Sequence, residues 1–366
     1  MISEILPVWI RMLFLFWASM LSTATIIFLF KKFFRKAWLM DHPEKYPHEG
    51  NRAPVPYWLW IVLFLNFLLQ SLLFLDIWYK KLIIILILWA IVTAVSFIDD
   101  LETIDVIKIK VHPLLRLMMQ IWVWAIIWIT SIKIWYISNI FGWIIRLDNY
   151  FLQLWDFRIF IIPLIFTIVW YVLVFNSINW SDSIPWLTSG LVETSFLILL
   201  VLTIKLYIQD TSYLSKENSE FVLLLLAILI PSVFVFWCFD IQKKFLIWDS
   251  WTMFLAFMIA TIAIISWGKI ATAATVLWMY IIDSFYVILV RLYNKKNPLK
   301  WDMIHHLHFR LGSLGFSKNF IRNLVYSLSF LFWIGAIFLD KTWKIIIFCI
   351  LMVIVFFVTK ILSLKK

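Results

Sequence analysis

Long apolar runs alternate with short polar stretches along the whole chain. A helix that crosses a bilayer needs roughly 20 predominantly apolar residues, and the runs reach that length repeatedly. Membrane-spanning helices are predicted at residues 7–30, 57–78, 81–98, 113–137, 158–177, 187–208, 220–239, 250–266, 269–293, 321–338 and 342–362. The pattern therefore predicts an all-α, polytopic integral membrane protein with about eleven transmembrane helices.

The composition agrees with a membrane protein and excludes an ordinary soluble domain. Hydrophobic residues make up 64% of the 366 residues and charged residues only 14%, against about 45–50% and about 25% in average proteins. The first residues, MISEILPVWI, lack the basic region and cleavage site of a signal peptide, so the first run is expected to remain as a span. No internal repeat or linker is found, so residues 1–366 are expected to form a single membrane-embedded domain.

The distribution of basic residues predicts how the spans are oriented. Two loops, which follow the first and the ninth run, are rich in them: Lys31, Lys32, Arg35, Lys36, Lys45 and Arg52, and Lys295, Lys296, Lys300, Arg310 and Lys318. By the positive-inside rule, the odd-numbered loops face the cytoplasm of a cell-membrane protein. The Lys80–Lys81 pair runs against this assignment. The net charge of +11 indicates basic loops beside anionic lipids and does not indicate nucleic-acid binding.

Polar residues gather in four of the predicted cytoplasmic loops. They are Asp99 and Asp100 after the third run, Asn176, Asn179 and Asp182 after the fifth, Asp249 before the eighth, and His305, His306, His308 and Arg310 after the ninth. Each group has an ordinary explanation: a solvated helix end, hydrogen bonds between helices, or interfacial histidines. Because all four fall on one face, where charges near the membrane tend to mark functional sites, a shared site is favoured.

The residue types in these groups suit phosphoryl transfer. Carboxylate and amide oxygens are the hard ligands that Mg²⁺ prefers, with Mn²⁺ as an alternative, and such a metal bridges substrate phosphates. Histidine and arginine side chains bind phosphate oxygens. No spacing typical of a zinc site, a Walker loop or a dinucleotide-binding fingerprint is present.

Five motifs, in order, resemble one family. They are LMDHPEKYPHEGNRAPVPYWLW after the first run, the Asp99–Asp100 pair with HPLLRLMMQ, NSINWSDSIPWLTSGL, IWDSWTMFLAF, and DMIHHLHFRL. Together they cover nearly the whole chain and resemble the polyprenyl-phosphate N-acetylhexosamine-1-phosphate transferases of the MraY, WecA and TagO type. The number of predicted spans is closer to the WecA and TagO branch.

The resemblance implies an activity and a role for each matched residue. The expected reaction moves a HexNAc-1-phosphate, with GlcNAc-1-phosphate as first choice, from a UDP-sugar to polyprenyl phosphate and releases UMP, in cell-wall or surface-glycan assembly. Matched residues are Asp249 and Asn179 as Mg²⁺ ligands, Asp99 and Asp100 as the essential acidic pair, Asn176 and Asp182 in the nucleotide-binding loop, and His305, His306, His308 and Arg310 on the donor's phosphate–sugar region. Whether His305 or His306 matches the first family histidine stays open. The side chains are expected to line one cytoplasmic cleft.

Tryptophan stands where the family has glycine. The chain has 24 Trp and only 7 Gly, although glycine averages about 7% of residues. The glycine places are held by Trp38, Trp58, Trp60, Trp186, Trp248, Trp251, Trp267 and Trp301. We interpret these tryptophans as glycines in the source cell, read from UGA codons by a reassigned code, whereas Trp170 and Trp180 fit the family as bulky residues. The alternative is a membrane protein rich in tryptophan at its interfaces.

Other functions remain open at this point. One is a phospho-MurNAc-pentapeptide transferase of the MraY type, and others are a non-catalytic membrane scaffold or a lipid or sugar transporter. A transporter is less favoured because its substrate site would lie near the bilayer midplane, whereas the acids here end the spans. Pro185 replaces a family aspartate that contacts the nucleobase, so the nucleotide is open too. The HexNAc, the prenyl chain length and the presence of a homodimer are not decided by the sequence.

Overall fold

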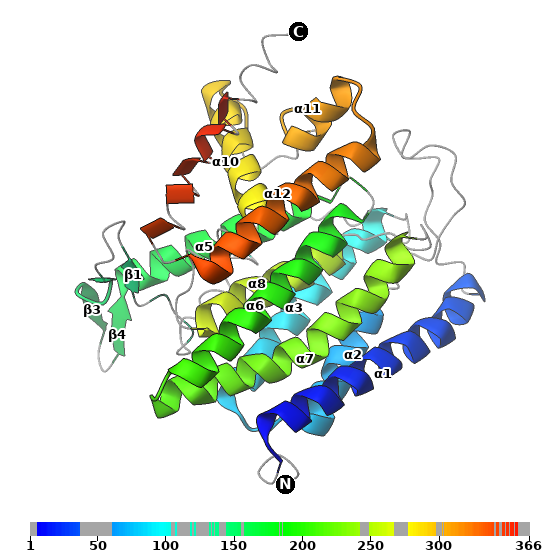
Figure 1. Cartoon of the computed structure of the whole chain (residues 1–366), viewed down its shortest axis with the longest axis vertical. Coiled ribbons are helices and arrows are strands. Elements are labelled where there is room, and N and C mark those ends of the chain that lie inside the picture. The colour runs from blue at the N-terminus through cyan, green and yellow to red at the C-terminus, as the bar shows by residue number, and fades with distance from the viewer. Residues whose placement is uncertain are drawn as a thin grey trace. The chain divides into compact units, whose positions relative to one another are not determined.

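A computed structural model gives the fold of most of the chain (Figure 1). It describes residues 6–36, 61–103, 107, 118, 121, 132, 134, 136–138, 144–154, 157–182, 184, 186–241, 249–266, 277–297, 302 and 304–339, with short pieces between 342 and 357. Internal contacts divide the chain into two compact units. The first unit comprises Met1–Met119 and Thr188–Leu255, and the second comprises Gln120–Leu187 and Ala256–Lys366.

Helices make up nearly all of the regular structure in the first unit. They are α1 (Val8–Lys36), α2 (Ile61–Phe74), α3 (Lys80–Thr103), α6 (Leu187–Gln209), α7 (Tyr213–Ile241) and the start of α8 (Asp249–Ile265). Helices α1 and α2 lie beside α7 (Figure 1). Residues of α7 between Phe221 and Ile230 are all buried, so this helix forms the centre of the unit's apolar core.

A polar network links α1, α2 and α7 inside that apolar packing. Asn66 donates hydrogen bonds to the hydroxyls of Ser19 and Ser232, each at 2.8 Å. The Ser19 hydroxyl in turn donates to the Ile228 carbonyl at 2.7 Å. Buried polar groups of apolar helices need such partners, because no water competes for them. Near the start of α1, Arg11 pairs with Glu220 of α7 at 2.5 Å.

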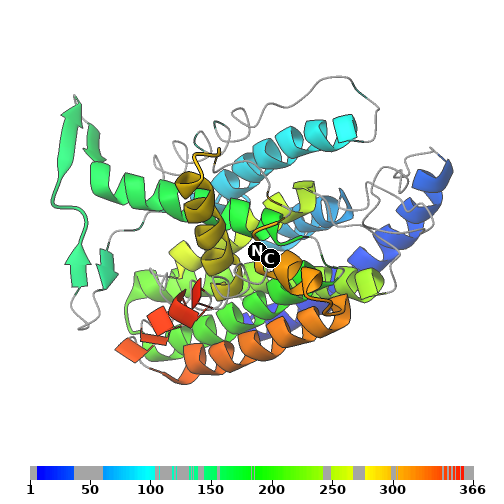
Figure 2. The ribbon, with the colours of Figure 1, turned by 90° about the horizontal axis from the view of Figure 1, so that it is seen from above.

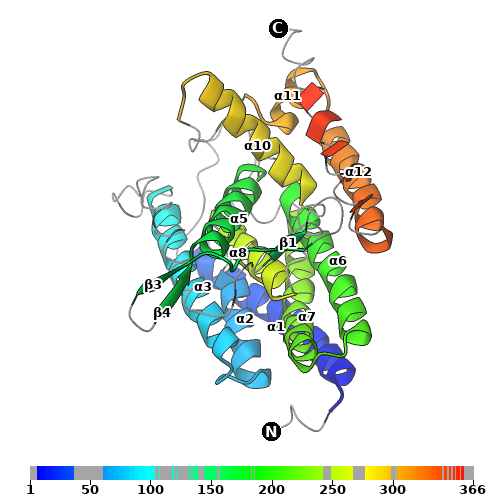
Figure 3. The same cartoon turned by 90° about the vertical axis from the view of Figure 1, so that its left-hand side faces the viewer.

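The second unit combines helices with two small hairpins. Its helices are α5 (Ile161–Trp180), the rest of α8, α10 (Trp278–Tyr293), α11 (Leu307–Ser313) and α12 (Lys318–Phe338). Helix α5 packs on α10, and α11 lies beside α12 (Figure 3). The indole N–H of Trp170 donates to the Ala260 carbonyl at 3.3 Å, and the hydroxyls of Tyr171 and Thr261 lie 2.7 Å apart. These contacts join α5 to the second half of α8.

The hairpins were not expected from the sequence. Strand β1 (Tyr136–Ser138) pairs antiparallel with β2 (Ile144–Arg146), and β3 (Phe151–Leu154) pairs antiparallel with β4 (Phe157–Phe160). Figure 2 shows them beside the start of α5. They lie around the predicted connection between the fourth and fifth spans, and apart from these short strands the described structure belongs to the predicted all-α class.

Most predicted spans agree with the helices where the chain is described, but β1 (Tyr136–Ser138) falls at the end of the predicted span 113–137 and β4 (Phe157–Phe160) at the start of 158–177. Among the described residues, five helices are long and apolar enough to cross a membrane: Val8–Phe30, Lys80–Glu102, Ile161–Trp180, Leu187–Gln209 and Tyr213–Phe239. Ile61–Phe74 and Ser250–Ile265 are shorter apolar helices. The predicted spans 113–137 and 342–362 lie mostly outside the described residues. The chain has the character of a multi-pass membrane protein, and the total of about eleven spans stays a prediction.

Candidate functional site

The acidic pair Asp99–Asp100 lies in the last turns of α3 and is buried. Asp99 is 6% exposed and Asp100 is 1% exposed. The hydroxyl of Ser250, which is also buried, donates a hydrogen bond to the Asp100 carboxylate. Asp249 is the first residue of α8, so this bond brings the end of α3 to the start of α8. Two predicted motifs, 150 residues apart in sequence, therefore meet inside the first unit.

The start of a helix is a favourable place for these carboxylates. The N-terminal end of a helix carries a partial positive charge, which stabilises anionic groups nearby. Ser250 is the second residue of α8, and its hydroxyl bond holds the Asp100 carboxylate at that end. The side chain of Asp249 lies outside the described part of the structure.

The predicted amide and nucleotide-loop residues follow one another at the end of α5, in the second unit. Asn176 and Asn179 lie in the last turns of the helix, half-buried, and Asp182 follows its end. The carboxamide of Asn176 donates to the Val172 carbonyl at 2.7 Å. The Asp182 N–H donates to the Asn179 carbonyl at 3.3 Å. The turn that carries Asp182 is thus tied to the turn that carries Asn179.

Helix α12 holds the next part of this loop. The hydroxyl of Tyr326 donates to the backbone carbonyl of Trp186, and the Arg322 guanidinium lies 3.5 Å from the centroid of the Trp186 ring. Trp186 has a φ of 65°, a left-handed conformation that is unusual for a bulky residue and that glycine adopts readily. The backbone conformation at this position therefore favours glycine over tryptophan.

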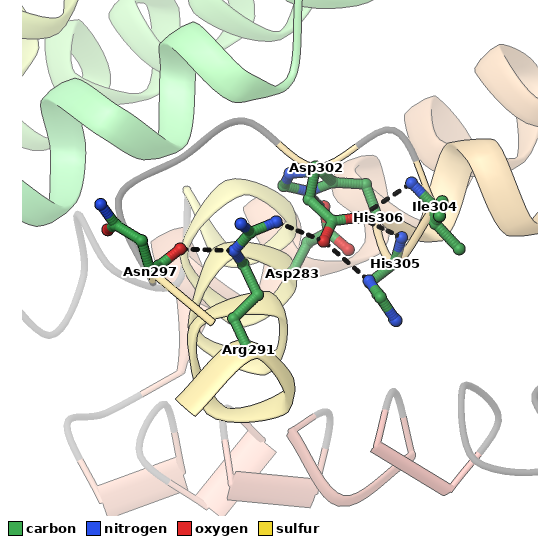
Figure 4. Close-up of polar contacts among 7 residues, drawn as sticks. All are labelled: Asp283, Arg291, Asn297, Asp302, Ile304, His305 and His306. Atoms are coloured by element: carbon green, nitrogen blue, oxygen red, sulfur yellow. Dashed lines mark hydrogen bonds and ion pairs between the residues drawn. The ribbon is translucent and has the colours of Figure 1, made fainter. Parts of the chain in front are cut away.

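The histidine motif precedes and begins α11, and two carboxylates organise it. Asp302 accepts the backbone N–H groups of Ile304 and His305 at 2.8 and 2.7 Å on one oxygen. Its other oxygen lies 2.7 Å from Arg291 and 2.7 Å from the His305 ring (Figure 4). Burial works to raise the pKa of Asp302, but these hydrogen bonds outweigh it and hold the pKa well below its usual value.

The second carboxylate is Asp283 of α10. Its oxygens lie 2.6 Å from Nδ1 of His306 and 2.8 Å from the backbone N–H of Leu307. Asp283 is 5% exposed and His306 is 1% exposed. Asp283 was not among the predicted site residues. It lies within the predicted span 269–293, where an acidic side chain is energetically costly and tends to mark a functional site. That signal could have found it.

The structure separates the three predicted histidines. His305 is partly exposed and pairs with Asp302, whereas His306 and His308 are buried with their rings stacked at 5.5 Å. Burial lowers the pKa of His308 to about 4, against the opposing attraction of Asp283. Arg310, also buried, lies with its guanidinium 4.8 Å from the centroid of the Tyr286 ring. His306, His308 and Arg310 therefore form the buried part of the motif.

The predicted metal ligands are described only in part. Within the described ranges, no group of three or more His, Cys, Asp or Glu side chains is close enough to hold a metal ion. Asp99, Asp100 and Asp249 belong to the first unit, and Asn176, Asn179, Asp182 and the histidine motif belong to the second. The single cleft that the sequence predicts across these groups stays a prediction.

Tryptophans at the glycine places differ in their hydrogen bonding from Trp170. Trp251 is 2% exposed, and its indole N–H, like that of Trp186, has no hydrogen-bond partner within the described part of the chain. A buried indole N–H normally has one, and Trp170 does. Trp38, Trp58, Trp60, Trp248, Trp267 and Trp301 lie outside the described residues. Trp89 and Trp237, which do not stand at glycine places, also lack a partner among the described residues, so the glycine interpretation stays a prediction.

Comparison with known proteins identifies the family. The chain is 26% identical over 199 residues to the probable undecaprenyl-phosphate N-acetylglucosaminyl 1-phosphate transferase of Bacillus subtilis (strain 168), and the match covers 52% of each chain. The chain thus spans about half the length of this relative. The family model described as Glycosyl transferase family 4 matches residues 82–267, from α3 past the end of α8. Because this match covers more than half of the chain, the protein belongs to Glycosyl transferase family 4.

Proposed function

We propose that the chain transfers GlcNAc-1-phosphate, or a closely related HexNAc-1-phosphate, from a UDP-sugar to polyprenyl phosphate. A phosphate oxygen of the lipid forms a new bond to the β-phosphorus of the donor, and the bond from that phosphorus to UMP breaks. The observation that carries the proposal is the contact between the buried Asp100 and Ser250, inside the stretch that matches the family. It joins the acidic pair to the start of α8, where Asp249 stands.

Asp249 and Asn179 are proposed as ligands of Mg²⁺, with Mn²⁺ as a substitute. A carboxylate and an amide oxygen are hard ligands, so the donor set fits a metal that keeps several waters and binds phosphate oxygens. When bound, such an ion neutralises charge that develops on the diphosphate. The remaining roles, which are proton transfer and positioning, fall to the chain's own side chains.

Asp99 and Asp100 are proposed to receive the lipid phosphate. A phosphate monoester has a second pKa near about 6 and still holds a proton part of the time at neutral pH. A buried carboxylate beside it can take that proton and leave a fully charged nucleophile. The bond from Ser250 fixes the orientation of Asp100 for this role.

His306, His308 and Arg310 are proposed to bind the donor's phosphate and sugar, with His305 at the edge of the motif. Their burial strengthens each contact with an anion, because water competes less. Asn176 and Asp182 are proposed for the nucleotide. Pro185 stands in place of a family aspartate, so competition between UDP-GlcNAc and other nucleotide sugars is part of the test.

The proposed setting is the cytoplasmic face of the cell membrane, where a soluble nucleotide sugar can meet a membrane lipid. Several helices of the described chain are long and apolar enough for that setting. The product, a lipid-diphosphate sugar, would serve the assembly of a cell wall or a surface glycan. The relative from Bacillus subtilis is described as a probable undecaprenyl-phosphate N-acetylglucosaminyl 1-phosphate transferase, which supports this choice of substrates.

The test is a transfer assay on purified membranes. Two forms of the chain are compared, one with tryptophan and one with glycine at 186, 248 and 251. Membranes that contain each form are incubated with radiolabelled UDP-GlcNAc, polyprenyl phosphate and Mg²⁺. We expect labelled lipid and released UMP that depend on both the lipid phosphate and the metal. Absence of labelled lipid from both forms, in protein shown to be folded, would contradict the proposal and favour a scaffold or a transporter.

A further inference from the structure

The contacts of Asp283 differ from those of an ordinary buried acid. It lies on α10, and its carboxylate contacts the start of α11, which follows α10 after the loop that contains Lys295 and Lys296. One oxygen accepts the backbone N–H of Leu307, the first residue of α11, at 2.8 Å. The other lies 2.6 Å from Nδ1 of His306. The two bonds hold both the ring and the backbone of the motif.

This geometry decides which ring nitrogen of His306 is available. An ionised carboxylate can only accept hydrogen bonds, so Nδ1 carries the proton of the bond to Asp283. The other nitrogen, Nε2, is then the atom that can exchange a proton or meet a ligand. When Nε2 is protonated as well, the carboxylate 2.6 Å away offsets the positive charge of the ring.

Nε2 of His306 is buried and has no hydrogen-bond partner within the described ranges. A buried imidazole nitrogen left without a partner is costly, and the ring has little room to turn, because it stacks on His308 and lies 6.0 Å from the Trp180 ring. A site that keeps such a nitrogen oriented without a protein partner is arranged for a ligand atom.

We infer that Asp283 is a positioning residue that holds His306 so that Nε2, once it also carries a proton, donates a hydrogen bond to a phosphate oxygen of the nucleotide-sugar donor. The inference rests on the proposed function. Asp283 itself does not touch the substrate: it fixes the proton on Nδ1, orients the ring and anchors the start of α11. Asp302 differs, because Arg291 already compensates its charge and its histidine is partly exposed.

A double-mutant cycle tests whether Asp283 acts through His306. Asp283→Asn keeps an oxygen for the Leu307 N–H but places an amide donor toward Nδ1, which moves the ring proton to Nε2. In the form of the chain that turns over, we expect Asp283→Asn and His306→Gln each to lower kcat with UDP-GlcNAc by at least about tenfold, with little change in KM for polyprenyl phosphate. If one acts through the other, the double variant is no slower than His306→Gln alone, within about twofold.

Asp148→Asn is the matched control. Asp148 is an acid of the same unit that pairs with Arg146 at 2.6 Å between strands β2 and β3, and we expect this variant to turn over as the parent does. An Asp283→Asn variant that turns over at the parent rate would overturn the inference. Losses that multiply in the double variant would also overturn it, since the two residues would then act independently.

A spectroscopic readout separates this inference from the proposed function. Nitrogen NMR of isotope-labelled histidine, with His306→Gln to assign the signal, reports which ring nitrogen carries the proton. We expect the proton on Nδ1 in the parent chain and on Nε2 in Asp283→Asn. A parent ring protonated only on Nε2 would overturn the inference, whether or not the chain transfers sugar phosphate. If Asp283→Asn fails to fold, the parent spectrum and Asp283→Glu, which should keep Nδ1 protonated, decide in its place.

Discussion

Buried carboxylates occur in both units of the molecule, but their surroundings differ. In the first unit, Asp99 and Asp100 end the membrane-length helix α3, and Asp100 accepts a bond from the hydroxyl of Ser250. In the second unit, Asp283 and Asp302 each bind a histidine ring and backbone N–H groups at the motif around the start of α11.

The difference indicates two uses of the same functional group. Both oxygens of Asp302 are occupied by nitrogen donors, one of them the guanidinium of Arg291. Such a carboxylate acts through the groups that it holds, because its lone pairs are committed. Asp100 accepts a hydrogen bond from a neutral hydroxyl at the start of α8, and in the proposed function it exchanges a proton with the bound substrate. Chemistry is therefore expected from the first pair and positioning from the second.

The largest effect is expected at Asp249. If it binds the metal against the diphosphate, Asp249→Asn should lower kcat by about a thousandfold or more, because a metal contributes several kcal/mol of charge stabilisation and each 1.4 kcal/mol is about tenfold. The thermal midpoint of unfolding in detergent should change little. Turnover at the parent rate at ordinary Mg²⁺ concentration would remove Asp249 from the metal site.

A large gain is expected from glycine at the family's glycine places. Overpacking costs about 1–3 kcal/mol, and a left-handed residue with a side chain costs about 1–2 kcal/mol more than glycine. We expect the chain with tryptophan at 186, 248 and 251 to be weak or inactive, and replacement of all three by glycine to raise transfer at least about tenfold.

Two controls accompany the glycine experiment. Trp170→Gly should instead destabilise the chain, by about 3–5 kcal/mol, because it removes a buried ring whose N–H bonds the Ala260 carbonyl. The coding DNA is the second control: UGG codons at 186, 248 and 251 would contradict the glycine interpretation, as would equal turnover of the two forms.

Asp302→Asn should act on stability more than on chemistry. Removing one partner of a buried ion pair costs about 3–5 kcal/mol, and Arg291 would keep a buried charge without its carboxylate. The lowered pKa of Asp302 means that its contribution is present above about pH 4, the usual pKa of a free aspartate, and is lost only as the pH falls through the folded value. A midpoint equal to that of the parent would show that the pair is not needed.

His308 should make stability depend on mildly acidic pH. Its pKa is lowered to about 4 by burial, so between about 4 and about 6.5 the unfolded chain binds a proton that the folded chain does not. The contribution of this group should be complete above about pH 6.5 and fall by at most about 1.4 kcal/mol per pH unit below it. Unfolding midpoints across this window should lose that slope in His308→Gln. Asp283 and His306 act on the same ring, and an unchanged slope in His308→Gln would contradict the assignment to His308.

The smallest effect is expected at Tyr326. Its hydroxyl bonds the carbonyl of Trp186, and a single hydrogen bond of this kind contributes about 0.5–1.5 kcal/mol. Tyr326→Phe should therefore raise KM for the UDP-sugar severalfold and leave kcat nearly unchanged, if the loop that follows Asp182 serves the nucleotide. A change in kcat alone would place this loop in the chemical step.

The helices and the acidic motifs could be predicted because their signals are local. Asp99–Asp100 and Asp249 stand at the ends of apolar runs, and the helices end or begin there. The pairing of Asp100 with Ser250, or of Asp283 with His306, depends on how separate helices pack, which no local pattern contains. The hairpins at 136–160 were missed because short strands in a loop have little periodicity. At Trp186 the sequence did indicate a local geometry. Tryptophan stands there in place of a family glycine, and the backbone has a positive φ.

The most direct test of the account is the fate of the donor's β-phosphate. UDP-GlcNAc carrying one radiolabel on that phosphate and another on the sugar is supplied to the form of the chain that turns over, with polyprenyl phosphate and Mg²⁺. Transfer of a sugar-1-phosphate predicts both labels in the lipid in equal amounts, with UMP released, and the loss of both in Asp249→Asn. Sugar label in the lipid without the phosphate label, with UDP released, would contradict the account.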